Sequence, residues 1–231
     1  METPAADLTD SLAAAGFFVL GGFSPGYGDP IPALKSGKHP RSLLLVGSTG
    51  QTLWPLLTSS PEFSDEKPDP LDRYTKRILS AIAIANDLEA LFPFEGPPFH
   101  PFQQWALACG GFSQSPMGVL AHQRYGPWTG FRAALLSELV VEVAVASKVD
   151  GPCETCRDKP CISACPVSAL SIENGYDVPK CREHLVSMKN ASCWSGCLAR
   201  RACPIGEDHR QDPANARFHM DCFTDISSTG Q

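Results

Sequence analysis

The spacing of the cysteines constrains this chain more than any other feature. Nine of its ten cysteines lie between Cys153 and Cys222, and eight of these form two sets of four. The first set is Cys153-Glu-Thr-Cys156, Cys161 and Cys165-Pro166; the second is Cys181, Cys193, Cys197 and Cys203-Pro204. Two sets that each end in Cys-Pro are typical of two [4Fe–4S] clusters. The pattern therefore predicts an iron–sulfur redox module.

The cysteine before each proline is expected to cross to the other cluster, as it does in two-cluster ferredoxins. This predicts one cluster on Cys153, Cys156, Cys161 and Cys203, and a second cluster on Cys165, Cys181, Cys193 and Cys197. The spacing is wider than the compact bacterial pattern, because four residues separate Cys156 from Cys161 and eleven separate Cys181 from Cys193. Cys109 and Cys222 are expected to be buried apolar fillers, with Cys222 the better spare ligand.

Other uses of cysteine remain as alternatives. Two zinc sites on the same eight thiolates would give stable knuckles without redox function. Disulfides are disfavoured, because close Cys-x-x-Cys spacing without a signal peptide indicates metal or redox chemistry in a reducing cytoplasm. The formal net charge of -6 argues against a nucleic-acid partner. No apolar run reaches the roughly 18 residues of a membrane span, so we expect a cytoplasmic protein.

Composition changes near Lys148–Pro152, where cysteines become dense. We therefore expect an α/β domain over residues 1–149 and a ferredoxin-like domain over residues 150–231. In the first, the pattern predicts helices over 4–15, 51–57, 70–91 and 102–109, buried strands over 17–20 and 42–47, and strand-like segments within 119–136. Gly16 is expected to end the first helix, and Asp69 to cap the helix that starts at Pro70.

The segment from His122 to Arg132 places a Gly126-Pro127 break among large aromatic residues and two arginines. Such a segment could wall a flat ligand, with aromatic rings on its face and arginines at its polar rim. The alternative is a tight turn between core strands, with Trp128 and Phe131 simply buried.

This segment resembles the His-Pro-Arg-Phe-Gly-Gly-Trp-Phe-x-x-Arg stretch of cobalamin-processing proteins of the CblC type, and the helix start at Asp69–Asp72 is similar as well. The domain order also resembles epoxyqueuosine reductase and the corrinoid reductive dehalogenases, and Pro179-Lys180-Cys181 is similar to a cluster-ligand stretch of the former. The resemblance implies a nitroreductase-like domain that holds a base-off corrinoid beside a two-cluster ferredoxin-like module. The candidate corrinoid contacts are then Arg124, Tyr125, Gly126, Trp128 and Arg132. Tyr125 and His122 are candidate catalytic residues by chemistry alone.

These observations predict a redox protein that passes electrons through two [4Fe–4S] clusters to a cobalamin, with a donor protein of the ferredoxin or flavodoxin type. The chain lacks the C-terminal repeat extension of epoxyqueuosine reductases, and this argues against tRNA modification. A flavin reductase is one alternative, because nitroreductase-like domains commonly hold FMN and the Gly47–Gly50 turn could meet a phosphate. A plain electron carrier and a zinc-binding interaction module are the others.

Overall fold

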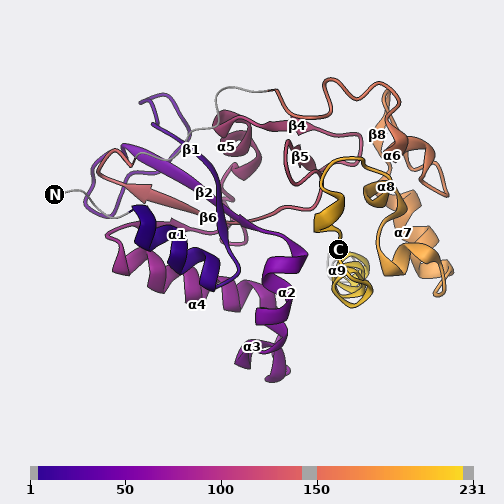
Figure 1. The fold of residues 1–231 in the computed structure, drawn as a ribbon, viewed down its shortest axis with the longest axis horizontal. Helices are drawn as coiled ribbons and strands as arrows, with labels where there is room; N and C mark the ends of the chain where they lie inside the picture. The colour runs from indigo at the N-terminus through magenta and orange to yellow at the C-terminus, as the bar shows by residue number, and fades with distance from the viewer. Residues whose placement is uncertain (1–4, 142–149, 226–231) are drawn as a thin grey trace. The chain divides into compact units, whose positions relative to one another are not determined.

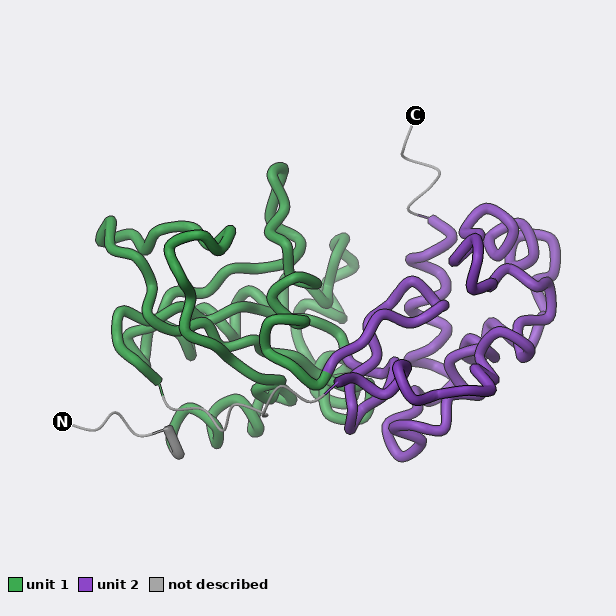
Figure 2. Tube along the Cα trace, turned by 90° about the horizontal axis from the view of Figure 1, so that it is seen from above, with its two compact units in different colours: residues 1–111, 130–149 green, residues 112–129, 150–231 purple. Residues whose placement is uncertain are grey.

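The computed structural model describes residues 5–141 and 150–225. The chain forms two compact units, which Figure 2 colours separately: Met1–Gly111 with Gly130–Val149, and Phe112–Thr129 with Asp150–Gln231. The predicted boundary near Lys148–Pro152 starts outside the described residues. A single division after residue 149 would place Phe112–Thr129 in the first domain. In the structure this segment belongs to the second unit. The two-domain division at 149 stays a prediction.

Backbone contacts explain why Phe112–Thr129 belongs to the second unit. A Cβ on Gly126 would lie 2.1 Å from the Ile205 carbonyl oxygen, and a Cβ on Gly151 would lie 2.2 Å from the Phe112 carbonyl carbon. Glycine thus lets this segment lie directly on the backbone of the cysteine-rich part.

The first unit is built on a four-stranded sheet in the order β1-β2-β6-β3 (Figure 1). Its strands are β1 (Phe18–Phe23), β2 (Ser42–Ser48), β3 (Glu89–Leu91) and β6 (Gly130–Ser137), and every pair is antiparallel. All of β2 is buried, because it is a central strand with apolar side chains on both faces. The first unit is therefore a mixed α/β structure with an antiparallel sheet.

Helices cover this sheet on its two faces (Figure 1). They are α1 (Ala5–Ala14), α2 (Gly50–Thr58), α4 (Pro70–Ala85) and α5 (Phe102–Cys109), and the short helix α3 (Pro61–Ser64) packs on α2 and α4. Leu12 of α1, Leu79 of α4 and Leu44 of β2 belong to one buried core. Helix α5 packs on β1 and β2, where Gly21 allows the close approach of Cys109.

Several predicted elements are confirmed, and two details are wrong. Helix α5 has the predicted bounds, and Gly16 ends α1 with φ +83. The predicted start of α1 at Pro4 lies outside the described residues. Helix α4 ends at Ala85 rather than at residue 91, because Asp87 turns left-handed with φ 53 and leads into β3. Asp69 precedes α4, but its side chain makes no capping hydrogen bond, because its own backbone is left-handed with φ 55.

The second unit consists of short elements. They are the hairpin β4 (Phe112–Gln114) and β5 (Leu120–His122), the pair β7 (Leu170–Ser171) and β8 (Gly175–Tyr176), helices α6 (Pro160–Ser163), α7 (Val178–Ser187), α8 (Leu198–Arg201) and α9 (Pro213–Asp225), and the 3-10 turns η1 (Ser192–Ser195) and η2 (Glu207–His209). A small core joins Met117, Cys161, Leu170 and Ala199. None of the helices within the described ranges combines the length and apolar character that a membrane crossing needs.

Candidate metal centres

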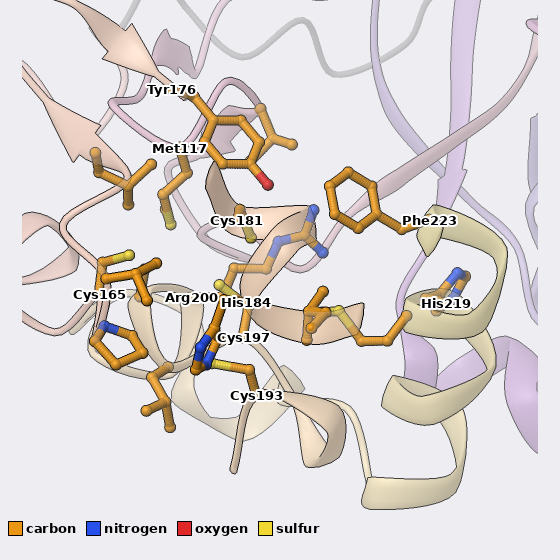
Figure 3. Close-up of a pocket in the computed structure, with 18 residues that line it drawn as sticks. Met117, Cys165, Tyr176, Cys181, His184, Cys193, Cys197, Arg200, His219 and Phe223 are labelled. Atoms are coloured by element: carbon orange, nitrogen blue, oxygen red, sulfur yellow. The ribbon is translucent and has the colours of Figure 1, made fainter. Parts of the chain in front are cut away.

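The larger cavity of the second unit is lined by four of the predicted ligands. It has a volume of about 240 Å³, and its cysteines are Cys165, Cys181, Cys193 and Cys197 (Figure 3). Cys181 comes from α7, Cys193 from η1 and Cys197 from the residue before α8. Cys165 closely follows α6. Four separate points of the chain thus converge on one cavity.

The second cavity is lined by the other four. Its volume is about 170 Å³, and its cysteines are Cys153, Cys156, Cys161 and Cys203. Cys153 and Cys156 belong to one loop, whereas Cys203 follows α8. Helices α6 and α8 pack against each other. This contact brings the Cys203 end of the second run beside the first run.

The two cavities divide the eight cysteines as the crossed pairing predicts, with Cys165 and Cys203 each on the set of the other run. Among the described residues, no three His, Cys, Asp or Glu side chains gather closely enough to hold a single metal ion. Both cavities are far larger than the roughly 10–15 Å³ that one water needs. Each cavity has room for a bound group. That these cysteines are metal ligands stays a prediction.

The thiols of each set are electrostatically coupled. Burial raises the pKa of Cys161, and the nearby Cys153 and Cys156 thiolates raise it further. Burial also raises the pKa of Cys193, where Cys197 and Cys181 add to the effect. Four thiolates around one cavity repel one another unless a cationic group lies between them. The donor set thus fits a centre that carries iron or another positively charged metal.

Lys159 orders the first cysteine loop. Its ammonium group donates to the carbonyl oxygens of Cys153 at 2.9 Å and Cys156 at 3.1 Å. The residue itself is left-handed with φ 38, directly before Pro160. The lysine therefore fixes the Cys-x-x-Cys loop and places a positive charge beside the smaller cavity.

Helix α9 supplies a wall of the larger cavity that the cysteine motif did not reveal. His219, Met220 and Phe223 of this helix line the cavity (Figure 3). The helix is held in place because the Arg217 guanidinium lies 4.2 Å from the Trp194 ring centroid, next to Cys193. In the sequence, the only indication of this role was the presence of aromatic and basic residues after Cys203. This indication is weak.

The two unassigned cysteines differ from each other. Cys109 is 1% exposed in the first unit, and burial raises its pKa to about 12. The prediction of a buried filler is confirmed for Cys109. For Cys222 it is wrong, since this residue of α9 is exposed and lines neither cavity.

The predicted ligand motif begins with a tight turn around His122. The His122 imidazole is 6% exposed, and its Nδ1 accepts hydrogen bonds from the backbone N–H groups of Arg124 at 3.1 Å and Tyr125 at 3.3 Å. Burial, and next the Arg124 charge, lower the pKa of His122 to about 4. The imidazole is therefore neutral near pH 7 and stabilises the turn. This geometry favours a structural role for His122, while its candidacy for catalysis stays untested.

The rest of the motif is divided between the units. Arg124, Tyr125, Gly126 and Trp128 belong to the second unit, whereas Arg132 belongs to β6 of the first. The Arg124 guanidinium lies 5.3 Å from the Tyr125 ring centroid. Trp128 is 4% exposed, and its indole Nε1 has no hydrogen-bond partner among the described residues. A buried indole N–H without a partner carries an uncompensated desolvation cost.

Arg132 is half-buried and lies near Ser48 and Asp72 in the first unit. Its Nε donates to the Ser48 hydroxyl at 2.8 Å. Burial lowers the pKa of Arg132 to about 10, and the charge of Asp72 opposes this effect. Burial in turn raises the pKa of Asp72. The arginine remains a cation that is only partly neutralised.

The Gly47–Gly50 turn leads from β2 into α2, as predicted. Thr49 and Thr52 form a reciprocal capping box at the start of α2, and the Thr49 backbone N–H donates to the Thr52 hydroxyl at 3.1 Å. These bonds satisfy donors that a phosphate would otherwise use. The turn therefore has a structural explanation without FMN.

Comparison with known proteins gives a fold likeness. No protein-family profile and no curated protein sequence matches this chain. The structure resembles that of the Caenorhabditis elegans B12-trafficking protein CblC, a homologue of human MMACHC, with a TM-score of 0.52, 14% identity, and coverage of 94% of this chain and 91% of that one. It also resembles epoxyqueuosine reductase from Streptococcus thermophilus, with a TM-score of 0.50, 14% identity, and coverage of 92% of this chain and 68% of that one. The chain therefore has a mixed α/β fold similar to those of these two proteins.

Proposed function

We propose that this chain is an iron–sulfur redox protein that passes single electrons through two [4Fe–4S] clusters to a bound corrinoid. The observation that carries the proposal is the sorting of eight cysteines into two four-cysteine cavities. Cys165 and Cys203 exchange places between the runs, and this exchange is characteristic of two-cluster ferredoxins. Bound clusters supply reversible one-electron transfer at these cavities.

The protein residues give each cluster its surroundings. Lys159 fixes the loop of the first set through two carbonyl groups. Helix α9 places apolar side chains beside the second set, and such a wall excludes water and tunes the reduction potential. A low-potential donor protein of the ferredoxin or flavodoxin type gives up one electron for each step.

The corrinoid part of the proposal is supported by the fold and by the ligand motif. One structural neighbour is a B12-trafficking protein. In this chain Arg124, Tyr125, Gly126, Trp128 and Arg132 are the proposed contacts, and the unpartnered Trp128 indole N–H is suited to a corrin side-chain amide. The protein would orient the corrinoid and exclude water from it.

The test is a titration of anaerobic, cluster-loaded protein with cob(II)alamin, followed by the EPR signal of cobalt. A protein-bound, base-off spectrum is expected. Trp128→Phe keeps an aromatic ring but removes the indole N–H and the pyrrole part of the ring, so it should weaken binding by at least about tenfold, the worth of one hydrogen bond. Tyr27→Phe is the matched control, because Tyr27 is 96% exposed. A spectrum that stays that of free cobalamin would exclude the corrinoid, and a yellow chromophore released on denaturation would favour a flavin enzyme instead.

A further inference from the structure

Trp194 anchors two cations beside the cysteines that line the larger cavity. It follows Cys193 directly and is 5% exposed. The Arg217 guanidinium lies 4.2 Å from its ring centroid, and the Lys189 ammonium lies 5.7 Å from it. The Trp194 indole N–H donates to the Met188 carbonyl oxygen at 3.0 Å and so holds the turn that carries Lys189. Both cations are therefore positioned next to a predicted cluster ligand.

Arg201 adds a third cation at the end of η1. Gly196 lies there, directly before Cys197. A Cβ on Gly196 would lie 3.5 Å from the Arg201 Cδ and 3.7 Å from the Ala216 Cβ of α9. The end of η1 is thus close to Arg201 of α8 and to the first turns of α9, which also carry Arg217. The basic patch is defined by its three cations: Lys189, Arg201 and Arg217.

Two cations of the basic patch lack an acidic partner. The Arg217 Nε donates to both carboxylate oxygens of Asp221, each at 3.0 Å. Lys189 and Arg201 are exposed, and neither forms an ion pair with any residue in the ranges 5–141 and 150–225. Met188, beside Lys189, is 50% exposed. Arginine and methionine are enriched in protein interfaces, so this surface suits contact with another protein.

The surface at the other four cysteines is mainly acidic. Segments 153–161 and 203–210 carry these cysteines, and their exposed charged residues are Glu154, Arg157, Asp158, Glu207 and Asp208. The two half-buried cations of these segments are already engaged. The Lys159 ammonium donates to carbonyl oxygens of its own loop, and Arg210 forms an ion pair with Glu207 at 2.9 Å. This surface would therefore repel an acidic protein.

We propose that the basic patch docks an acidic single-electron donor protein, so that electrons enter at the Cys165, Cys181, Cys193 and Cys197 set. In each encounter the donor centre is oxidised by one electron, and the cluster of this set is reduced by one. The chain has a net charge of -6, which opposes the approach of an acidic donor, whereas a local positive patch steers the donor to one face. This inference rests on the proposed function and adds the docking face of its donor.

The test is stopped-flow electron transfer from a purified acidic [2Fe–2S] ferredoxin, reduced beforehand, to anaerobic cluster-loaded protein. The double variant Lys189→Glu with Arg201→Glu should lower the second-order rate constant by about tenfold or more at low salt. Added salt should slow the wild type and bring the two rate constants together. Photoreduced 5-deazariboflavin, a small reductant without the ferredoxin's acidic surface, should reduce both proteins at equal rates.

A matched control separates docking from overall charge. Lys35→Glu with Lys67→Glu makes the same change in charge at two exposed lysines of the first unit, and it should change the rate constant by less than about twofold. The neutral pair Lys189→Gln with Arg201→Gln makes a milder change, should load its clusters as the wild type does, and should give an intermediate rate constant.

Equal ferredoxin rate constants for loaded wild-type protein and both patch variants would overturn the docking face while leaving the clusters in place. An equal loss in the control pair would overturn it as well, because overall charge would then explain the effect. Wild-type protein without iron and sulfide would instead remove the proposed function itself.

Discussion

His122 offers a direct test of the turn that opens the ligand motif. Its neutral Nδ1 accepts from the backbone N–H groups of Arg124 and Tyr125 inside a buried environment. His122→Ala leaves both N–H groups without that acceptor. Arg124 is exposed and Tyr125 is half-buried, so water can reach the two N–H groups; at roughly 0.5–1.5 kcal/mol for each lost hydrogen bond, the free energy of local opening should fall by about 1–3 kcal/mol. His122→Asn retains an acceptor and should lose much less.

The same imidazole predicts a pH dependence with a defined sign. The folded pKa of about 4 lies below the reference value of 6.5, so the opened chain binds the proton first as pH falls. The contribution of His122 is therefore complete above about pH 6.5 and is lost progressively down to about pH 4. The full difference corresponds to at most about 3 kcal/mol, and solvent screening reduces it to about 1–2 kcal/mol.

Amide hydrogen exchange at Arg124 and Tyr125 measures this opening directly, without global unfolding of a metal-loaded protein. After correction for the intrinsic exchange rate at each pH, the protection factors of these two amides should fall by about tenfold from pH 7 to pH 5 in wild type. It should stay constant in His122→Asn. Full protection in His122→Ala, or an imidazole that titrates near 6.5, would refute the structural role.

Three further predictions concern the cavities and the backbone. Cys156→Ala and Cys197→Ala should each remove about half of the iron and sulfide, whereas Cys222→Ala should remove none; loss of all iron from either variant would contradict two separate sets. Lys159→Met should destabilise the first cysteine loop by about 1–3 kcal/mol and speed iron release to a chelator, unlike Lys180→Met, whose Nζ makes one long bond of 3.4 Å. Gly126→Ala should cost about 2–4 kcal/mol by thermal denaturation, because the new Cβ would meet the Ile205 oxygen at 2.1 Å. Gly175→Ala, with φ +69 and open space around it, should cost only about 1–2 kcal/mol; equal losses would show that the contact with Ile205 is unimportant.

The sequence predicted those elements whose formation depends on residues close to one another along the chain. Gly16 and helix α5 follow from turn and helix signals that act within a few residues. The crossed pairing of the eight cysteines was predicted from the precedent of two-cluster ferredoxins, and it stays a prediction.

The features that the sequence did not predict depend on contacts between residues far apart along the chain. The end of α4 and strand β3 depend on pairing of Glu89–Leu91 with β6, which can outweigh helical spacing in so short a segment. The place of Phe112–Thr129 depends on close backbone approach at Gly126 and Gly151. Helix α9 reaches the larger cavity through Arg217 on Trp194, a contact across 23 residues that no local motif encodes.

The most direct test of the central claim is a Mössbauer spectrum of anaerobically prepared, iron-57-loaded protein, with iron, sulfide and zinc quantified on the same sample. We predict about eight irons and eight sulfides per chain, all in [4Fe–4S] clusters. A colourless protein with about two zinc ions per chain would contradict the account, as would iron in mononuclear form.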